Sequence, residues 1–418
     1  MSASLLRRRF AVALLASAAL GAPARVLAQR AYFPAPGDGW EHRTPEQVGL
    51  SAQAVKDAIA LAVAAEATTP RDLLEAQTIT FGRAPHGEAI GPVRDRGAAT
   101  GMIVRRGYIV GEWGDPSRVD VTHSVTKSFV TTTIGLAYDR KMIRSVNDPV
   151  RGYMAPIVAL KGPPAGGATG KPTKGTLFDA FEVLEPFESE HNRRITWDHL
   201  LRQTSDWQGT LWSKPDWADR PKGDIEQWKV RPRSEPGSVY SYNDVRVNLM
   251  ALASMNVWRR PLPQVLREYV MDPIGASPTW RWFGYDNSWV VMDGQLMQSV
   301  AGGGHWGGGM MISARDMARF GLLTLHKGKW GDRQLLSEEW IRMSTTPGPA
   351  NDQYGYANYF LNTGRKAIPS APESAFYHLG NGNNVIYVDP VNDLVVVMRW
   401  ISTMRAVDSV VGKLIGGR

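Results

Sequence analysis

Short β-rich runs lie at both ends of this chain, and a long stretch of mostly helical pattern separates them. Residues 102–104 and 108–110, Met-Ile-Val and Tyr-Ile-Val, flank a turn and predict a hairpin. Residues 385–388 and 394–398 flank a second turn, and the later run is apolar throughout, as in a strand that is buried on both faces. This distribution predicts a single sheet that is assembled from the two ends of the chain.

Helices are expected to complete this architecture. Ser51 can cap a helix that follows it, and the patterns at 124–138, 314–325 and 406–415 predict three more. The predicted fold class is therefore α+β, an antiparallel sheet flanked by helices with an inserted, mostly helical subdomain. The expected parts are a sheet subdomain at about 29–135 and 295–418 and a helical subdomain at about 136–294.

The first 28 residues have the pattern of a signal peptide. Arg7-Arg8-Arg9 precedes an apolar run from Ala11 to Leu20, and the segment ends at Val26-Leu27-Ala28. The run is shorter than a membrane span normally needs. Arg-Arg-x-Phe also fits a twin-arginine signal, so we expect export to the periplasm or the medium, by the Sec or the twin-arginine route, with no stable membrane anchor after processing. The alternative is an apolar anchor helix that is never cleaved.

Composition excludes several kinds of site and partner. The chain has no cysteine, which excludes disulfides, thiolate nucleophiles, cysteine-ligated zinc and a lipid-modified cysteine. Removal of residues 1–28, which hold four arginines and no acid, lowers the formal charge from +8 to +4. No long basic run remains, so nucleic acid is not an expected partner.

Ser124-Val125-Thr126-Lys127 is a Ser-x-x-Lys sequence, and no other serine of the chain has a lysine three residues on. Positions i and i+3 share one face of a helix, so the hydroxyl and the amine can meet. A serine hydroxyl is a poor nucleophile until another group accepts its proton, and Lys127 can accept it if burial lowers the pKa of its amine. The structural alternative is a helix-capping serine followed by a solvated lysine.

A second candidate segment runs from Glu235 to Asp244. Its Pro-Gly turn leads to Tyr240 and Tyr242, and an amide and a carboxylate follow. A tyrosine that is held near an ammonium group can act as a base or relay a proton. Otherwise the segment is a capped helix start, with Asn243 or Asp244 as the cap and both rings in the core.

The third candidate segment is 377–384, Tyr-His-Leu-Gly-Asn-Gly-Asn-Asn, directly before the strand that begins near 385. Its glycines allow a substrate to approach the backbone, whose N–H groups could complete an oxyanion hole. His378 adds a titratable donor at that edge. The alternative is an ordinary Gly/Asn turn.

In this order and spacing, the three segments resemble the motifs of the serine β-lactamase and penicillin-binding protein superfamily. The resemblance is greatest to its class C branch, which includes D-Ala-D-Ala peptidases, esterases and amide hydrolases. It runs from about 44 to 415 and includes supporting stretches at 44–50, 195–201 and 312–321. The resemblance implies a β-lactamase/transpeptidase-like fold.

Carried over by motif, the resemblance implies that Ser124 is the nucleophile and Lys127 its proton partner. Tyr242 matches the tyrosine of the family's Tyr-x-Asn element, and its spacing from the Pro-Gly turn favours it over Tyr240. Asp244 stands where the family usually has asparagine.

The resemblance also assigns the third segment. His378-Leu379-Gly380 occupies the place of the family's Lys-Thr-Gly, so His378 joins the implied catalytic set. The implied oxyanion hole consists of the backbone N–H groups of Ser124 and Asn381, beside Gly380.

Two departures from the family pattern bear on the substrate. A histidine that is mostly neutral at pH 7 stands where lactamases have a cationic lysine, and Leu379 replaces the hydroxyl-bearing threonine. Asp244 adds negative charge where an anionic substrate would lie. Both changes favour an esterase or amidase with a neutral or cationic substrate over a β-lactamase.

The sequence therefore predicts a serine hydrolase for a small-molecule ester, amide or peptide-like substrate, with neither cofactor nor metal. The alternatives are a class C-like β-lactamase or D-Ala-D-Ala peptidase, a transacylase, and a non-catalytic binding or sensor protein on the same scaffold. Residues 302–307 match Gly-x-Gly-x-x-Gly, but no β-rich run precedes them, so a dinucleotide site is not expected. His305 and Trp306 are weaker candidates for the pocket wall, and core packing is the alternative for both.

Overall fold

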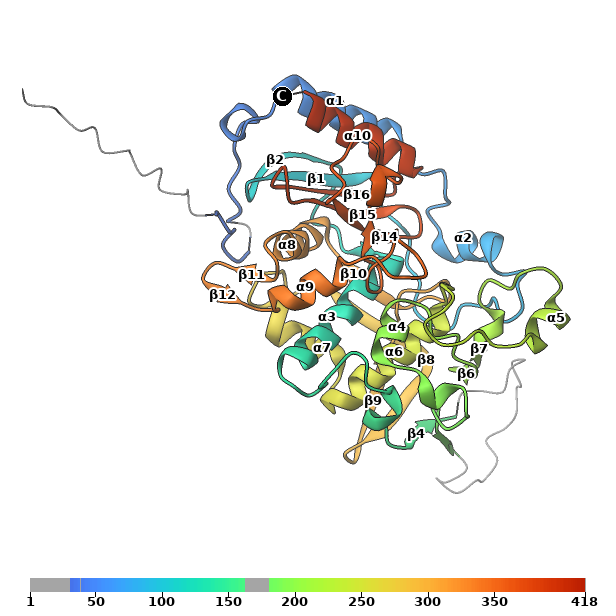
Figure 1. Cartoon of the computed structure of the whole chain (residues 1–418). Helices are drawn as coiled ribbons and strands as arrows, with labels where there is room; N and C mark the ends of the chain where they lie inside the picture. The colour runs from blue at the N-terminus through green and yellow to red at the C-terminus, as the bar shows by residue number, and fades with distance from the viewer. Residues whose placement is uncertain (1–30, 38, 162–179, 418) are drawn as a thin grey trace, which may run out of the picture. The chain divides into compact units, whose positions relative to one another are not determined.

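The computed structural model describes residues 31–37, 39–161 and 180–417, and one of its main elements is a six-stranded antiparallel sheet (Figure 1). Its strands are β1 (Thr100–Arg105), β2 (Tyr108–Trp113), β13 (Phe360–Leu361), β14 (Phe376–Gly380), β15 (Asn384–Asp389) and β16 (Leu394–Arg399). They lie in the order β13-β14-β15-β16-β1-β2, and the β16–β1 pairing sets Ile103 opposite Val396. The prediction that both chain ends build one sheet is confirmed.

Strand β16 shows why this sheet is buried on both faces. Leu394, Val396 and Met398 belong to a core cluster on the face that α1 (Ala52–Ala64) and α10 (Met404–Gly416) cover. Val395 and Val397 point the opposite way, into the larger core cluster. Successive side chains of a strand alternate between the two faces, so an all-apolar run is what a strand between two layers requires.

Most helices begin at a capping side chain, and the helices expected after Ser51 and at 314–325 and 406–415 begin near the predicted residue. Ser51 Oγ accepts the Ala54 N–H at the start of α1, and Ser313 does the same for Asp316 at the start of α8 (Ala314–Leu325). Helix α8 packs on the face of the sheet opposite α1 and α10. The other helices are α2 (Leu73–Thr80), α3 (Thr126–Asp139), α4 (Trp197–Leu201), α5 (Ile225–Val230), α6 (Asp244–Trp258), α7 (Leu262–Leu266) and α9 (Glu338–Ser344).

The middle of the chain holds helices α4 to α7, but it also supplies much of a second antiparallel sheet, which the sequence did not predict. That sheet has the order β3-β10-β8-β4-β5, with β9 paired to β8. Its strands are β3 (Asp120–Val121), β4 (Ile157–Leu160), β5 (Phe181–Leu184), β8 (Arg281–Met292), β9 (Gln295–Val300) and β10 (Gly309–Ile312). The 12 residues of β8 are rich in aromatic and β-branched side chains, a strand signal that the emphasis on helices overlooked. Two short hairpins are β6 (Thr210–Leu211) with β7 (Lys214–Pro215) and β11 (Lys329–Trp330) with β12 (Arg333–Gln334).

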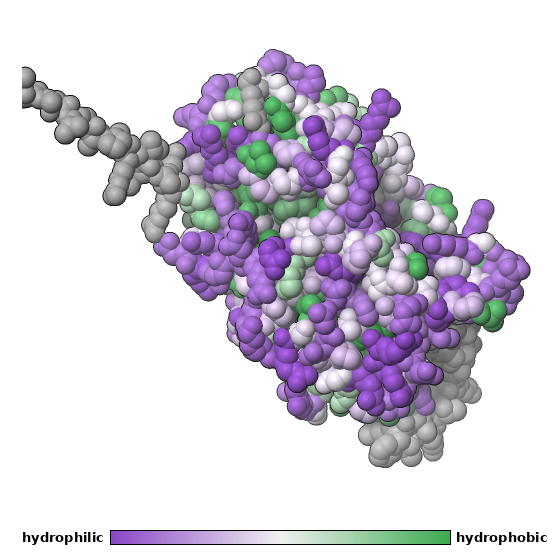
Figure 2. Space-filling model, in the orientation of Figure 1, coloured by the Kyte–Doolittle hydropathy of each residue, from purple (hydrophilic) through white to green (hydrophobic). Residues whose placement is uncertain are grey.

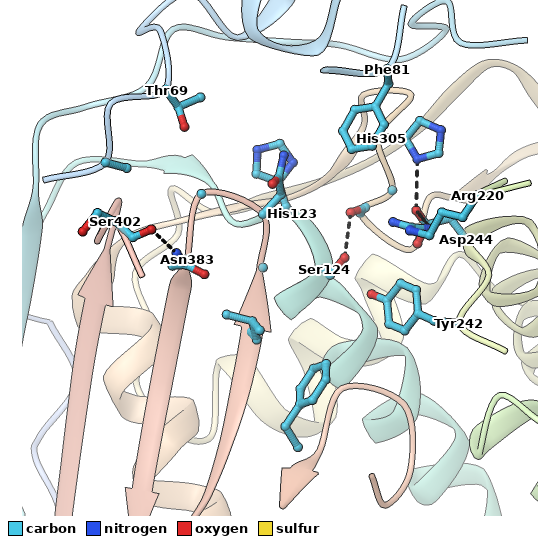
Figure 3. Close-up of a pocket in the computed structure, with 18 of the residues that line it drawn as sticks. Thr69, Phe81, His123, Ser124, Arg220, Tyr242, Asp244, His305, Asn383 and Ser402 are labelled. Atoms are coloured by element: carbon cyan, nitrogen blue, oxygen red, sulfur yellow. Dashed lines mark hydrogen bonds and ion pairs between the residues drawn. The ribbon is translucent and has the colours of Figure 1, made fainter. Parts of the chain in front are cut away.

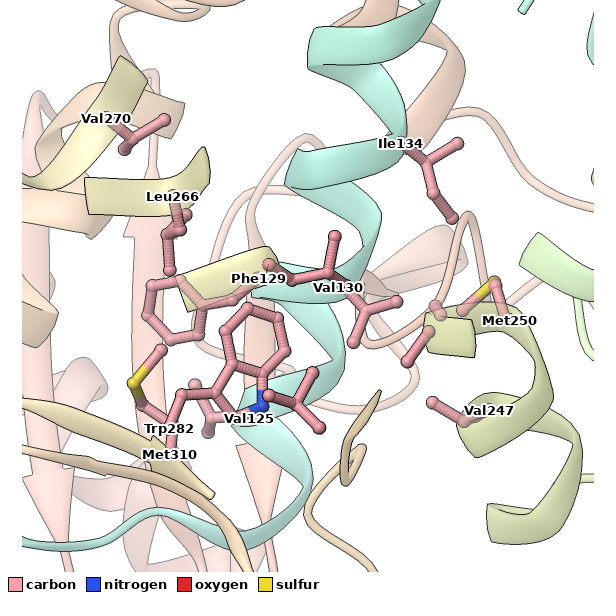
Figure 4. Close-up of a cluster of buried hydrophobic side chains, with 14 of the residues drawn as sticks. Val125, Phe129, Val130, Ile134, Val247, Met250, Leu266, Val270, Trp282 and Met310 are labelled. Carbon is pink, nitrogen blue, oxygen red and sulfur yellow. The ribbon is translucent and has the colours of Figure 1, made fainter. Parts of the chain in front are cut away.

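Helix α3 lies in the core between these layers. Phe129, Val130 and Ile134 are fully buried, as the sequence predicts, and pack among apolar side chains of α6, α7, β8 and β10 (Figure 4). A helix that is buried on all sides is held rigidly by its neighbours. The residues at its first turn are therefore fixed relative to α6 and β10.

Some expectations fall outside this description. The predicted signal peptide at 1–28 lies outside the described residues. Among the residues that the structure describes, no helix has the length and apolar character to cross a membrane. The surface that faces the viewer in Figure 2 is mainly hydrophilic, with apolar side chains scattered over it.

Candidate active site

Ser124 and Lys127 meet at the first turn of α3. Ser124 lies in a short 3₁₀ turn, His123–Val125, that runs directly into the helix. Lys127 Nζ donates a hydrogen bond to Ser124 Oγ at 2.8 Å. The spacing of three residues thus brings the hydroxyl and the amine together, and it does so on a helix that the core fixes.

The environment of Lys127 differs from the one that the sequence suggested. The side chain is fully buried, yet its Nζ lies 2.7 Å from Asp244 Oδ1 and donates to the Gly302 carbonyl at 3.2 Å. Burial alone would lower the pKa of Lys127, but Asp244 and Tyr242 outweigh it, so the pKa is raised. Burial therefore does not lower the pKa of Lys127 in this site, and the route to a neutral amine that the sequence suggested is not the one that the structure shows.

Tyr242 completes the group, and Tyr240 does not. The Tyr242 hydroxyl interacts with both Ser124 and Lys127, and the Lys127 Nζ lies 5.1 Å from the centroid of its ring. Burial raises the pKa of Tyr242, although the ammonium of Lys127 opposes that effect. Tyr240 packs against the ring of Tyr354, with centroids 5.1 Å apart, and is not among the residues that line the pocket.

Asp244 is a buried carboxylate held by cations. It begins α6, whose N-cap is Asn243, and its second oxygen, Oδ2, lies 3.1 Å from Arg220 Nη1 and 3.3 Å from His305 Nδ1. Burial alone would raise the pKa of Asp244, but Arg220 and Lys127 hold it well below its usual range. Asp244 is therefore ionised and balances charge inside the site.

These groups open onto a pocket of about 470 Å³ (Figure 3). Ser124, Tyr242 and Asp244 are among its lining residues, as are Gly380 and Asn381 of the predicted oxyanion hole. Gly380 is needed here because a Cβ at that position would lie 2.1 Å from the Thr122 carbonyl oxygen. The end of β14 therefore passes against the backbone that leads into Ser124.

His378 does not reach this pocket. Its ring is fully buried, and Nδ1 lies 2.8 Å from Ser128 Oγ and 3.1 Å from the Asn358 carbonyl oxygen. Burial lowers the pKa of His378 to about 3, so the ring is neutral. Side chains alternate along β14, and Leu379 is the one that lines the pocket. The motif place assigned to His378 is present, but its side chain faces the core.

Several lining residues have little or no signal in the sequence. His305 does line the pocket, as one of its two interpretations suggests, whereas Trp306 is fully buried and donates its indole N–H to the His86 carbonyl. Arg220 and its neighbour Asp219 are single charged residues in an irregular segment, so no motif identifies them. They are adjacent to Asp244 only in the fold.

Asp219, Asp244 and His305 form a group whose ligand-type atoms lie within 4.8 Å of one another. Such a set of oxygen and nitrogen donors can in principle hold a divalent cation. Here Lys127 and Arg220 already contact the carboxylates, at 2.7 Å from Asp244 and 2.6 Å from Asp219. Two resident cations oppose a further one, so the donor set fits an internal ion-pair network better than a metal centre.

Comparison with known proteins is consistent with this geometry. A family model described as "Beta-lactamase" matches residues 94–403. Two relatives, from Escherichia coli O157:H7 and strain K12, are provisionally named D-alanyl-D-alanine carboxypeptidases. Each is 24% identical over an alignment of 197 positions, and the alignment covers 39% of this chain and 45% of the relative. The chain therefore matches less than half the length of these curated relatives.

Solved structures share the fold at low sequence identity. A penicillin-binding protein homologue from Caulobacter crescentus has a TM-score of 0.53 at 13% identity, covering 87% of this chain and 98% of that one. A family VIII carboxylesterase has a TM-score of 0.53 at 14% identity, with 88% and 97% covered. EstCE1, a hydrolase with promiscuous acyltransferase activity, has a TM-score of 0.52 at 16% identity, with 87% and 99% covered. These likenesses establish a β-lactamase/transpeptidase-like α+β fold.

Proposed function

The chain belongs to the Beta-lactamase family, and from that premise we propose that it hydrolyses an ester or amide bond through an acyl-enzyme on Ser124. The observation that carries the proposal is the 2.8 Å contact between Lys127 Nζ and Ser124 Oγ at the wall of the pocket. A binding or sensor protein on the same scaffold has no need of a buried amine on a pocket serine. The intact set of Ser124, Lys127 and Tyr242 argues against that alternative.

The reaction divides into two halves with one proton carrier. Ser124 Oγ attacks the substrate carbonyl carbon, and its proton passes to the Lys127–Tyr242 pair. The pair returns the proton to the departing alcohol or amine, which leaves the acyl group on Oγ. Water then attacks the acyl carbon, gives its proton to the pair, and Ser124 recovers its hydrogen.

The proton carrier also predicts an alkaline preference. The pKa values of Lys127 and Tyr242 are both raised, so both groups hold their protons near neutral pH. One of these protons must leave before the pair can accept the proton of Ser124. The fraction of competent enzyme therefore rises with pH, and we expect kcat/KM to rise from pH 7 toward the alkaline range.

Charge at the pocket supports an uncharged substrate. His378 is buried and neutral, so the place of the family's cationic lysine supplies no charge to the pocket. Arg220 lies beside Asp244 and neutralises it, which weakens the earlier argument for a cationic substrate. Much of the remaining wall is polar but uncharged, or apolar: Thr68, Thr69, Asn381, Asn383 and Ser402 on the polar side, and Phe81, Phe360 and Leu379 on the apolar side.

A D-Ala-D-Ala peptidase is the second candidate, because the two curated relatives carry that name. Its substrate ends in a carboxylate, for which Arg220 is the exposed cation in the pocket. Rates on a D-Ala-D-Ala peptide, a cephalosporin reporter and short p-nitrophenyl esters rank the candidates. A clear preference for the esters supports the proposal, and a preference for the peptide or the lactam contradicts it.

The nucleophile is tested by covalent labelling. A fluorophosphonate should add one group to the intact protein, and peptide mapping should find it on Ser124. The Ser124→Ala variant should lose both labelling and turnover with an unchanged thermal unfolding curve. Ser409→Ala, which changes an exposed serine of α10, is the matched control and should keep both. Labelling that persists in Ser124→Ala would reveal a different nucleophile.

We also propose that the protein is exported. The support is the sequence of residues 1–28, with its arginines, short apolar run and small-residue end. Expression of the full chain in a bacterial host, followed by intact mass and cell fractionation, tests this. A protein that retains residue 1 and stays with the cytoplasmic fraction would contradict it.

A further inference from the structure

One carboxylate in this site serves two cations. Asp244 is 1% exposed, and its oxygens divide between Lys127 Nζ, 2.7 Å from Oδ1, and Arg220 Nη1, 3.1 Å from Oδ2. An isolated buried carboxylate is costly, and contacts with two cations offset part of that cost. The charge on Lys127 is thus balanced by a carboxylate that also forms an ion pair with Arg220.

The position of Arg220 is fixed by its backbone conformation and by an ion pair with Asp219. Its backbone has a φ of 55°, an uncommon conformation for a residue other than glycine. Its Nη1 donates to Asp219 Oδ1 at 2.6 Å, and the buried Asp219 also accepts the backbone N–H of Asp244. Asp219 therefore anchors both members of the Arg220–Asp244 pair.

The guanidinium also reaches the proton carrier directly. Its Cζ lies 4.9 Å from the centroid of the Tyr242 ring, and the Lys127 Nζ lies 5.1 Å from the same centroid. Two cations near one phenol stabilise its ionised form, while the carboxylate of Asp244 opposes it. The balance among these four charges decides how readily the pair gives up a proton.

We propose that Arg220, anchored by Asp219, is a positioning residue that shares the Asp244 carboxylate with Lys127 and so balances charge around the Ser124 nucleophile. The inference rests on the proposed function. It also explains the departure at Asp244: the family's usual residue there is uncharged, and this chain adds an acid and, from a distant segment, the arginine that compensates it. The alternative role for Arg220 is to bind an anionic group of the substrate.

Other titratable groups near Asp244 belong to the same balance. His305 Nδ1 lies 3.3 Å from Asp244 Oδ2 and 3.7 Å from Asp219 Oδ1. Burial and the charge of Asp244 raise the pKa of Asp219, the carboxyl group that anchors Arg220. The other groups whose ionisation Asp244 influences are His123, Tyr285 and Tyr354.

The test is a double-mutant cycle of Arg220→Gln and Asp244→Asn, measured on an uncharged p-nitrophenyl ester across pH. In Arg220→Gln, the Asp244 carboxylate no longer contacts Arg220, so it stabilises the ammonium form of Lys127 more strongly. We expect kcat near pH 7.5 to fall about 10- to 100-fold, KM to change little, and the alkaline rise of kcat to move up by about one pH unit or more. Arg220→Lys keeps the charge and should recover part of the loss.

The cycle separates the two roles of Arg220. In the Asp244→Asn background there is no carboxylate to share and only the direct effect of Arg220 on Tyr242 remains, so adding Arg220→Gln should change kcat by no more than about 3-fold. A further 10-fold loss in that background would overturn the proposal. So would an unchanged pH profile in Arg220→Gln with a raised KM confined to an anionic ester, because that pattern belongs to a substrate anchor.

Further controls and measurements keep each outcome interpretable. Arg151→Gln, which removes an exposed arginine paired with the exposed Glu188, should alter none of these values. If Arg220→Gln alone does not fold, the comparison of Asp244→Asn with the double variant still decides. Thermal unfolding of the wild type, the two single variants and the double variant measures the coupling between Arg220 and Asp244 without turnover. A loss of Tm in the double variant that equals the sum of the two single losses would contradict the shared carboxylate. Fluorophosphonate labelling of the wild type separately tests Ser124, so a failure of the proposed function is distinguishable.

Discussion

Substitution of Gly380 by alanine should lower kcat strongly while it lowers the stability of the fold only moderately. The added Cβ would lie 2.1 Å from the Thr122 carbonyl oxygen and 3.2 Å from the Ser124 backbone nitrogen. An ordinary non-bonded contact between heavy atoms needs about 3.5 Å, so β14 and the turn that carries Ser124 must separate by more than about 1 Å. That separation widens the gap between Ser124 and Asn381, where we expect the carbonyl oxygen of the substrate to bind.

The two effects have different sizes. A misplacement of about 1 Å between reacting groups can cost about 100-fold in rate, which is the loss of kcat that we expect. Overpacking of this kind lowers the free energy of unfolding by about 1–3 kcal/mol, so the variant should still fold.

The assay is steady-state hydrolysis of an uncharged p-nitrophenyl ester, with thermal unfolding measured on the same samples. Gly152→Ala is the matched control, because a Cβ there meets no atom within 4 Å and should change neither value. A kcat for Gly380→Ala within about 2-fold of the wild type, at a normal Tm, would refute the contact between β14 and the turn that carries Ser124 as a determinant of rate.

Four further substitutions test three separate parts of the structure. Tyr242→Phe should lower kcat by about 10²- to 10⁴-fold while Tyr240→Phe stays within a few-fold, and the reverse order would show that the wrong ring was assigned. The pKa of His378 is about 3 in the folded protein and 6.5 for an unperturbed ring, so the unfolded chain binds more protons between these two pH values. The free energy of unfolding should therefore fall as the pH drops from about 6.5 toward 3. Denaturant titrations should show a weaker pH dependence in His378→Gln. Gly135→Ala places a Cβ 2.3 Å from Trp340 Nε1, where α3 meets α9. Urea unfolding should show that the free energy of unfolding falls by about 1–3 kcal/mol, while fluorophosphonate labelling of Ser124 is retained. An unchanged free energy of unfolding would mean that α9 moves freely.

Local patterns were sufficient for a large part of this protein. The span of α8 and the approximate positions of α3, β16 and α10 follow from side-chain periodicity, because the period of a helix or strand depends only on nearby residues. The same reasoning joins Ser124 to Lys127, since three residues on a helix nearly complete one turn. The order of the three motif segments then indicates the family.

The second sheet was missed for a physical reason as well. Strand β8 pairs with β4, β9 and β10, and β4 and β10 are distant in the sequence. The stability of a strand depends on such partners more than on its own residues. A run with aromatic and β-branched residues therefore does not show by itself which strands it joins.

What the sequence by itself determined is which chemical groups are present and which short stretches carry them. Only the tertiary structure decided how those groups meet: Arg220 beside Asp244, His378 facing the core, and an ammonium instead of a neutral amine at Lys127. The direction of a pKa shift is the difference between burial and the nearby charges, and those charges come from distant segments. No local pattern contains that difference, because it exists only once the chain has folded.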